Sequence, residues 1–287
     1  MRITTQATTS ANQVRCALLS LRNEILTLKF ICSQDRGKSA CTKVSDVSSS
    51  KPSQGSKRAG YVLHVLTASG AAAGLVALQA VFNGEWRQAL LWLIVCQVLD
   101  GLDGPIARKI DVTIHAPRID GHILDLVVDY LTCVVVPVAL LASLELLPLR
   151  FEIWVAGAIF ITSALWFARI DQETDDHWFN GFPAVWNLVV PSFLILDASS
   201  ETVMVISILL CVLQLTTIKI PHLVRVVWMR KLTLPFTIVY LINLASLSWS
   251  YSDNLGSEPN SLEVAILLGF PAYIALLSIK RTWFQKA

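Results

Sequence analysis

Two runs decide the fold of this chain: DGLDGPIAR at residues 100–108 and GHILDLVVD at residues 121–129. They lie between strongly apolar segments and contain four carboxylates, at Asp100, Asp103, Asp125 and Asp129. Carboxylates next to hydrocarbon are costly, so an ionisable residue inside a membrane segment indicates a functional site. On helices, the aspartates of each run share one face, three or four positions apart. Two such helices facing each other would gather the four carboxylates into one oxygen-rich pocket, which suits a hard divalent cation.

If these residues were only helix-end aspartates solvated at the membrane interface, the glycines and the arginine beside them would have no explanation. Together the two runs resemble the signature of the CDP-alcohol phosphatidyltransferase family, D-x2-D-G-x2-A-R-x8-G-x3-D-x3-D. All eight signature residues are present: Asp100, Asp103, Gly104, Ala107, Arg108, Gly121, Asp125 and Asp129. The spacer from Lys109 to Asp120 has twelve residues, where most of the family has eight. A twelve-residue spacer resembles the bacterial phosphatidylcholine synthase branch, which condenses CDP-diacylglycerol with free choline.

A second run, F-x-G-F-P-A-x-W-N at residues 179–187, is similar to a motif of the same choline-using branch. The resemblance extends from about residue 58 to the C-terminus. It implies an enzyme that uses Mn²⁺ or Mg²⁺, makes phosphatidylcholine from CDP-diacylglycerol and choline, and releases CMP. The expected partners are these two substrates and membrane lipid, with no nucleic acid, and the sequence leaves a homodimer open.

The resemblance also implies a role for each aspartate. Asp100, Asp103 and Asp125 are expected to ligate the metal. Asp129 is expected to contact the metal site and to act as general base on the acceptor hydroxyl, directly or through one water. Attack of an alcohol on the β-phosphorus of a CDP-lipid builds negative charge on the phosphoryl oxygens. Divalent ions held by carboxylates can neutralise that charge.

The four other signature residues are expected to bind the cytidine nucleotide. Gly104 and Gly121 lack a Cβ, so backbone or nucleotide can approach closely. Ala107 is small on the same helix face as the aspartates and leaves room for the cytidine. Arg108 carries a planar fork of donors that suits pyrophosphate oxygens.

The acceptor choline offers only a hydroxyl and a quaternary ammonium to recognise. Aromatic faces attract a quaternary ammonium, by about 2 kcal/mol or more when it is desolvated. The candidate choline-binding residues are the aromatic side chains nearest the expected site: Trp178, Phe179, Phe182, Trp186 and Tyr130. Each has an alternative role in the aromatic belt at the membrane interface. A loop with four acidic residues, 171–176, precedes the aromatic run and is expected on the same side of the membrane.

The composition is that of an all-α, polytopic membrane protein: 54% of the residues are hydrophobic, 15% are charged, and the mean hydropathy is +0.58. A spanning helix needs about 20 mostly apolar residues. Eight spans are predicted: Tyr61–Phe82, Trp86–Leu102, Ile123–Leu147, Phe151–Ala168, Phe182–Leu196, Val203–Ile218, Leu234–Trp249 and Ser261–Ile279. The second and fifth of these are short or polar. The fold implied by the resemblance is the membrane helix bundle of the CDP-alcohol phosphatidyltransferases.

The lysines and arginines give the expected orientation, because cytoplasmic loops carry an excess of them. With a cytoplasmic N-terminus, thirteen of these residues fall in inside segments, and only Arg87 and Arg150 fall outside. Both termini and the 100–129 stretch are therefore expected on the cytoplasmic side of a bacterial inner membrane. Nucleotide-activated substrates are available on that side.

Residues 1–57 differ in composition from the rest of the chain. They are rich in serine and threonine, and their only acidic residues are Glu24, Asp35 and Asp46. A poorly ordered arm is predicted for residues 1–57 and a membrane-embedded catalytic domain for residues 58–287. The arm loosely resembles an organellar transit peptide. A membrane-surface arm and a stretch upstream of the true start codon are the alternatives.

Two other functions stay open from the sequence. A type II phosphatidylserine synthase, or another member of the family, would use a different acceptor alcohol. A serine enzyme would need a basic residue for the acceptor's carboxylate, such as Arg118 or Arg169. A cation transporter would use membrane aspartates to line an ion path, but such a path does not call for the glycines and the arginine. Metal-dependent release of CMP separates the transferase from the transporter.

Overall fold

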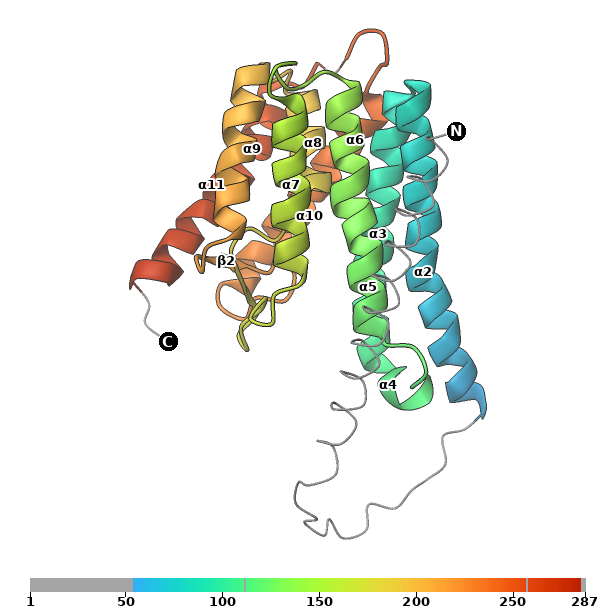
Figure 1. Ribbon diagram of the computed structural model, residues 1–287. Coiled ribbons are helices and arrows are strands. Elements are labelled where there is room, and N and C mark those ends of the chain that lie inside the picture. The colour runs from blue at the N-terminus through green and yellow to red at the C-terminus, as the bar shows by residue number, and fades with distance from the viewer. Residues whose placement is uncertain (1–53, 111, 257, 285–287) are drawn as a thin grey trace, which may run out of the picture. The chain divides into compact units, whose positions relative to one another are not determined.

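The computed structural model describes residues 54–110, 112–256 and 258–284. These residues are mostly helical (Figure 1), which confirms the all-α prediction. The helices are α2 (Gln54–Asn83), α3 (Trp86–Lys109), α4 (Val112–His115), α5 (Gly121–Asp129), α6 (Val136–Ser143), α7 (Glu152–Phe167), α8 (Trp186–Ile195), α9 (Ser200–Gln214), α10 (Arg230–Ser250) and α11 (Ser261–Ile279). Two π-helices, η2 (Tyr130–Val135) and η3 (Lys280–Phe284), and two short strands, β1 (Trp178–Asn180) and β2 (Lys219–Pro221), complete the described elements.

Five continuous helical segments among the described residues are long and apolar enough to cross a membrane: Lys57–Asn83, Trp86–Lys109, Gly121–Ser143, Arg230–Ser250 and Ser261–Phe284. The third of these joins α5, η2 and α6 into one helix. The apolar helices α7, α8 and α9 are shorter, with 16, 10 and 15 residues. The polytopic membrane character predicted from composition is confirmed, and each of the eight predicted spans overlaps one of these helices.

The second predicted span ends later than expected. It was expected to end at Leu102, whereas α3 continues to Lys109, so the first signature run lies on a single helix. Pro105 lies inside this helix. Proline lacks an N–H, so the carbonyl of Gly101, four residues earlier, loses its usual helical partner close to Asp100.

The fifth predicted span begins later than expected. A helix from Phe182 was predicted, whereas α8 begins at Trp186. The reason is the backbone before it, because Gly181 and Ala184 have φ values of 81° and 55° and Pro183 lies between them. Left-handed residues interrupt a right-handed helix, and this non-helical stretch belongs to the second sequence motif.

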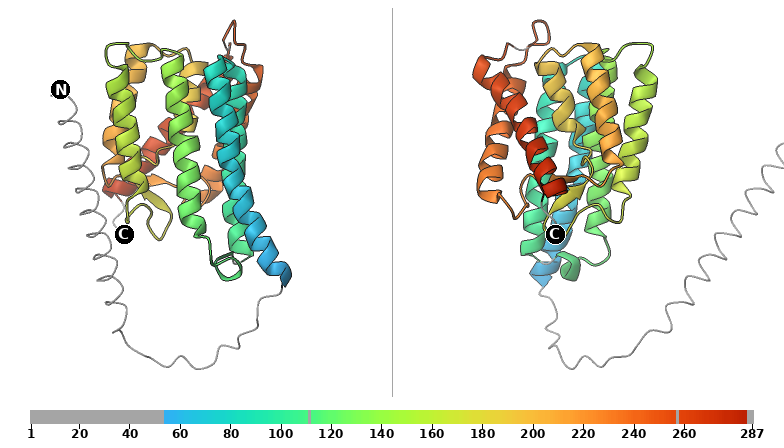
Figure 2. Two further views of the ribbon diagram at one scale, coloured as in Figure 1. Left: turned by 45° about the vertical axis from the view of Figure 1, so that its right-hand side comes forward. Right: turned by 90° about the vertical axis from the view of Figure 1, so that its left-hand side faces the viewer.

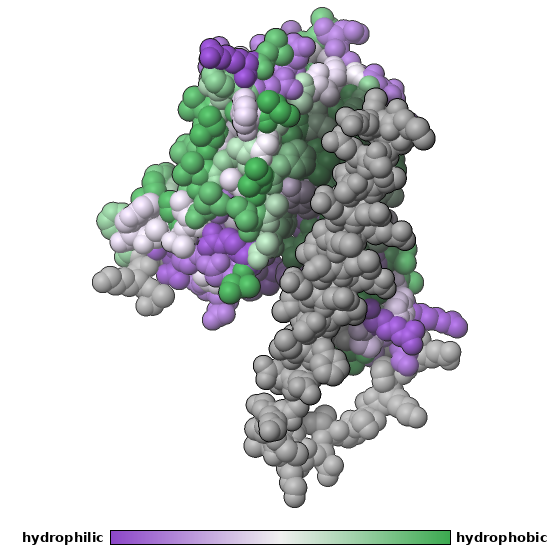
Figure 3. Space-filling view, in the orientation of Figure 1, coloured by the Kyte–Doolittle hydropathy of each residue, from purple (hydrophilic) through white to green (hydrophobic). Residues whose placement is uncertain are grey.

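The membrane helices stand side by side, and the hydrophilic residues lie toward the two opposite ends of the bundle. Helix α2 packs against α3, α4, α5 and α6, α7 packs against α9, and α10 packs against α11. In Figures 1 and 2, α2 and α5 extend further toward the lower side than α7 and α9 do, and α4 lies beneath α5. Figure 3 shows apolar side chains along the middle of the bundle and hydrophilic ones toward both ends, the distribution expected of a surface in lipid.

A close contact between α2 and α5 fixes the helix that carries the second signature run. A Cβ built on Gly70 of α2 would lie 2.8 Å from Cγ1 of Val128 on α5. A side chain at position 70 would therefore push the two helices apart. Small residues that allow such close approach are the usual means of packing helices in a membrane. The approach holds α5 against α2, with its aspartates on the side that faces α3.

The lower side in Figure 1 carries a small layer built on the two strands. Strand β1 pairs antiparallel with β2, with Trp178 opposite Pro221 and Asn180 opposite Lys219. Arg169, just after α7, holds this layer: its Nη1 donates to the carbonyl oxygens of Asn180, Gln214 and Thr216, at 3.3, 3.2 and 2.8 Å. The Arg169 guanidinium thus joins β1 to the end of α9.

The predicted N-terminal arm lies almost entirely outside the described residues. Residues 54–57 are the exception, because α2 begins at Gln54, before the expected start of the membrane domain at residue 58. The boundary between the arm and the domain stays a prediction.

Candidate active site

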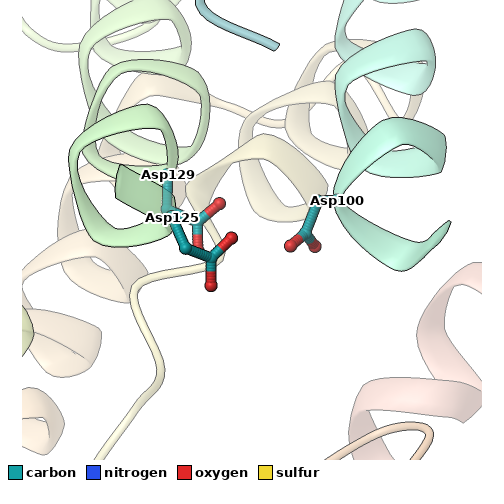
Figure 4. A group of neighbouring side chains, drawn as sticks. All are labelled: Asp100, Asp125 and Asp129. Atoms are coloured by element: carbon teal, nitrogen blue, oxygen red, sulfur yellow. The ribbon is translucent and has the colours of Figure 1, made fainter. Parts of the chain in front are cut away.

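Three of the four signature aspartates come together between α3 and α5. Asp100 projects from α3 and meets Asp125 and Asp129 of α5, as Figure 4 shows. One carboxylate oxygen from each residue lies within 4.8 Å of those from the other two. The three side chains are half-buried. The four-residue spacing of the second run therefore places both of its carboxylates on one helix face, as predicted.

The start and the end of α5 both contribute to this placement. Asp120 caps its N-terminus, because its Oδ1 accepts hydrogen bonds from the backbone N–H groups of His122 and Ile123 at 3.0 and 3.2 Å. The helix then changes to the π-helix η2 directly after Asp129. Short π-helical turns are frequent at functional sites. The cap fixes where α5 begins, and the π-turn sets the direction in which the chain continues beyond the last aspartate.

Asp103 lies beside this group without being part of it. It is buried, with 7% of its surface exposed, and the hydroxyl of Thr67 on α2 lies next to it. Its carboxyl is still close enough to act electrostatically on Asp100 and Asp125. The predicted pocket of four carboxylates thus has three at short range and the fourth turned toward α2.

The three-carboxylate group, hereafter the carboxylate group, has the composition of a divalent-metal site. Carboxylate oxygens are the preferred ligands of Mg²⁺ and Mn²⁺. Three negative charges this close, and half-buried, repel one another strongly unless a cation balances them. The residues present therefore fit a divalent cation, which would neutralise negative charge at this point when bound.

The expected nucleotide-binding residues lie on α3 and α5, the two helices that carry the aspartates. Arg108 is exposed, and its Nη1 lies 3.4 Å from a Cβ built on Gly104. A Cβ built on Gly121 would lie 3.1 Å from Cε1 of His64, so a buried imidazole fills the space beside this glycine. Ala107 packs against the Leu63–Val112–Ala116 cluster. Both small residues have packing roles, and their contact with a nucleotide stays a prediction.

Three of the five aromatic candidates for choline binding are buried: Trp178, Phe182 and Trp186 have 0%, 7% and 0% of their surface exposed. Trp178 packs near Trp228, and Phe182 meets Trp186 edge to face. The indole N–H of Trp186 donates to Ser163 Oγ at 3.0 Å. Their choline role stays a prediction, and the observed contacts are those of packing residues.

The other two candidates are half-buried and keep some exposed surface. Phe179 stacks on His222 at 5.0 Å between ring centroids and meets Trp166 edge to face. Tyr130 follows Asp129 directly, and its hydroxyl donates to the carbonyl of Phe160 at 3.0 Å. Of the five candidates, these two offer the most ring surface to a ligand.

The acidic loop before β1 has basic partners within the protein. Asp171 forms a bidentate pair with Arg169, and hydrogen bonds from that guanidinium hold the pKa of Asp171 below its usual value. Asp176 pairs with Arg281 at 2.8 Å. Glu173 contacts His177 at 2.6 Å and Arg225 at 3.4 Å. Three of the four acidic residues in the loop thus have an arginine partner within the protein.

Two side chains that sequence reasoning missed contact the carboxylate group or support that contact. Gln97 of α3 donates from Nε2 to Asp100 Oδ2 at 3.3 Å, and Asn187 of α8 donates from Nδ2 to Gln97 Oε1 at 2.8 Å. A polar Gln three residues before Asp100 in an apolar segment was a visible signal. Asn187 is the last residue of the second motif, and nothing else in the sequence indicated a contact with Gln97.

His222 was also missed. Its Nδ1 accepts hydrogen bonds from the backbone N–H groups of Val224 and Arg225 at 3.2 and 3.3 Å, while its ring stacks on Phe179. Burial is the largest cause that lowers the pKa of His222, to about 4. The ring is therefore neutral at physiological pH and serves as the cap of a turn.

Comparison with known proteins identifies the family of this chain. The family model for CDP-alcohol phosphatidyltransferase matches residues 62–214, slightly more than half of the chain. A phosphatidylcholine synthase of Pseudomonas aeruginosa is 34% identical over 233 residues, which cover 79% of this chain and 95% of the relative. Those of Bradyrhizobium diazoefficiens and Borreliella burgdorferi are 35% and 30% identical, over 77% and 78% of this chain and 83% and 94% of the relatives. With its full signature on facing membrane helices, the chain belongs to the CDP-alcohol phosphatidyltransferase family.

Proposed function

We propose that the protein is a phosphatidylcholine synthase, which transfers the phosphatidyl group of CDP-diacylglycerol to choline and releases CMP. The observation that carries the proposal is the carboxylate group of Asp100, Asp125 and Asp129 on two facing membrane helices. The relatives of that name and the twelve-residue spacer support choline as the acceptor. Family membership argues against the cation transporter, which does not require the glycines and the arginine of the signature.

In the proposed reaction, the hydroxyl oxygen of choline bonds to the β-phosphorus of CDP-diacylglycerol, and the bond from that phosphorus to CMP breaks. Asp129 takes the hydroxyl proton as general base. Arg108, exposed one turn beyond Gly104, donates to the pyrophosphate oxygens and stabilises the departing CMP. Asp100, Asp125 and Asp129 would hold Mn²⁺ or Mg²⁺, which neutralises charge on the phosphoryl oxygens when bound. Asp103, which lies beside them, would become a fourth ligand only if its side chain turned from α2 toward the cation.

For choline recognition we propose the exposed ring surface of Phe179 and Tyr130, with Trp178, Phe182 and Trp186 packed behind them. Tyr130 follows Asp129 directly, and Phe179 on β1 is linked to Tyr130 through the edge-to-face ring contacts of Trp166 and Phe167. Cation–π attraction suits a quaternary ammonium, whose charge cannot be neutralised by loss of a proton. If the aromatic rings bind the ammonium group, the ion-paired acidic residues of the 171–176 loop stabilise the loop and do not bind choline.

The phosphatidylserine synthase alternative has less support in this structure. Such an enzyme needs a cation for the acceptor's carboxylate. Arg169 already donates to three backbone carbonyls and to Asp171. Arg118 is exposed in the spacer and is the other candidate. An acceptor without a carboxylate therefore agrees better with the way Arg169 is used.

We also propose that the catalytic unit comprises residues 58–287 and that the carboxylate group opens to the cytoplasmic side of a bacterial inner membrane. Every signature residue lies within that range. The positive-inside rule supports the orientation, since the loops on this side carry most of the lysines and arginines.

The proposal is tested by supplying membranes that contain the protein with CDP-diacylglycerol and radiolabelled choline, serine or inositol, with Mn²⁺, Mg²⁺ or a chelator. The expected result is metal-dependent incorporation of choline into phosphatidylcholine with equimolar CMP. Membranes with the Asp125→Ala variant, checked for insertion, serve as the inactive control. Incorporation of serine in place of choline, or equal turnover by Asp125→Ala, would refute the assignment.

A further inference from the structure

A chain of two amide side chains connects the second sequence motif to the carboxylate group. Asn187, the last residue of the F-x-G-F-P-A-x-W-N run, donates from Nδ2 to Gln97 Oε1 at 2.8 Å. Gln97 in turn donates from Nε2 to Asp100 Oδ2 at 3.3 Å. The two amides come from positions 90 residues apart in sequence, on α8 and α3.

The chain has a direction, and that direction matters for Asp100. A glutamine amide can turn by half a rotation and exchange its donor and its acceptor. With Nδ2 of Asn187 donating to its oxygen, Gln97 keeps its NH₂ group directed at the carboxylate. The opposite orientation would place the Gln97 oxygen against an Asp100 oxygen, two acceptors facing each other. Both hydrogen bonds are made only when Asn187 donates to Gln97 and Gln97 donates to Asp100, so Asn187 supports the orientation in which the NH₂ group of Gln97 meets the carboxylate.

Asn187 itself is held firmly at the start of α8. Gly181 has φ of 81°, and a Cβ at this position would lie 2.6 Å from the carbonyl oxygen of Gln214. The N–H of Gly181 donates to Ile218 O at 2.9 Å, and the indole of Trp186 donates to Ser163. The motif thus anchors the segment that precedes and includes Asn187.

A second observation separates Asn187 from an ordinary packing residue. Its side chain is buried, with 3% exposed, yet its Oδ1 has no hydrogen-bond partner among the described residues. A buried acceptor without a partner costs stability. Within the described part of the chain, the Asn187 amide therefore forms a hydrogen bond only through its Nδ2, and the acceptor of that bond, Gln97, donates to the Asp100 carboxylate.

We propose that Asn187 and Gln97 are positioning residues that orient the Asp100 carboxylate toward the divalent cation, and that the second motif serves to hold Asn187 in place. The inference rests on the proposed function, because it assumes that the carboxylate group binds a metal. Hydrogen-bond partners behind metal ligands fix ligand orientation, and their loss weakens metal affinity by about tenfold to a hundredfold.

The test uses the purified full-length protein in detergent, with Mn²⁺ binding measured by electron paramagnetic resonance in the absence of substrate. Asn187→Leu removes the donor without adding charge, and Gln97→Leu removes the next amide. The expected result for each is Mn²⁺ binding weaker by about tenfold to a hundredfold. Asn243→Leu is the matched control, because Asn243 is also buried but donates to Glu263 O at 3.1 Å, and it should bind Mn²⁺ as the wild type does.

The double variant with both Gln97→Leu and Asn187→Leu distinguishes action through Gln97 from a separate effect. If Asn187 acts through Gln97, the double variant binds Mn²⁺ no more weakly than Gln97→Leu alone. The thermal stability of metal-free Asn187→Leu should stay close to that of the wild type, because the change also removes the unpartnered Oδ1. A purely structural role predicts the reverse, with stability lost and Mn²⁺ affinity kept.

Three results would overturn the inference. Wild-type Mn²⁺ affinity in both Asn187→Leu and Gln97→Leu, with loss of binding in Asp100→Ala, would refute it and leave the proposed function intact. Additive losses in the double variant would show that Asn187 does not act through Gln97. A wild-type protein that binds no Mn²⁺ would refute the metal site and the inference together.

Discussion

Removing one charge from the carboxylate group should make the metal-free protein more stable and the enzyme inactive. The change is Asp125→Asn, which keeps the shape of the side chain and removes its negative charge. The three oxygens lie within 4.8 Å of one another, and at an effective dielectric constant of about 20 each pair repels by about 3.5 kcal/mol. The substitution removes two of the three pairwise repulsions.

The net gain is smaller than that sum, because bound protons and water already relieve part of the repulsion. We expect the metal-free variant to be more stable than the metal-free wild type by about 1–3 kcal/mol, or about 2–10 °C in melting temperature. Mn²⁺ should reverse the order. At a thousand times its dissociation constant a ligand stabilises the folded state by about 4.1 kcal/mol, which exceeds the advantage of the metal-free variant, and only the wild type should gain this.

The assay is thermal unfolding of both proteins in detergent, after chelation and again with added Mn²⁺. Asp171→Asn is a suitable control, because Asp171 lies in a surface ion pair outside the carboxylate group. Two outcomes would contradict the argument. A metal-free variant that melts below the metal-free wild type would show that the three charges do not repel in the folded protein. Equal Mn²⁺ stabilisation of both proteins would show that the cation binds elsewhere.

Three further predictions test other parts of the structure. Gly181→Ala should lower the free energy of unfolding by about 3 kcal/mol or more, because the residue has φ of 81° and a Cβ would lie 2.6 Å from a backbone oxygen; wild-type stability in denaturant would contradict this. Burial lowers the pKa of His222 to about 4, so stability present above about pH 6.5 should fall by about 3 kcal/mol as the pH drops toward 4. His222→Asn, which keeps an acceptor for the turn, should lose less over that range. In a background without other cysteines, Asn254→Cys should react with an impermeant reagent in intact cells, and Arg118→Cys should react only after the membrane is opened; the opposite pattern would reverse the proposed orientation.

Much of the fold and part of the site follow from local patterns. Long apolar stretches predict membrane helices wherever they occur, because lipid requires the backbone to satisfy its own hydrogen bonds. The spacing of Asp125 and Asp129 puts both on one face of any helix, whatever that helix packs against. These predictions needed no knowledge of tertiary structure, and the gathering of Asp100, Asp125 and Asp129 agrees with them.

The rest depends on contacts between distant parts of the chain. Trp178 and Trp186, two of the five aromatic residues expected to contact choline, are fully buried, and the local sequence does not reveal which residues cover them. The amide chain from Asn187 to Asp100 joins residues 90 positions apart in its first step, so sequence spacing carries no sign of it. Helix ends also depend on single backbone angles, as the late start of α8 shows.

The π-helical turn after Asp129 rotates α6 about the helix axis relative to α5, so the two parts of this membrane helix do not present the faces that one uninterrupted α-helix would. A π-turn contains one residue more than the α-helix that it interrupts, and one residue corresponds to about 100° of rotation. The face of α5 that carries Asp125 and Asp129 can therefore point at α3 while α6 turns Val138 and Leu141 into the core. Deleting one residue from 130–135 would couple the two halves again and rotate either the carboxylates or the core side chains away. A helix of this kind lets the chemistry at one end and the packing at the other change separately as a sequence evolves.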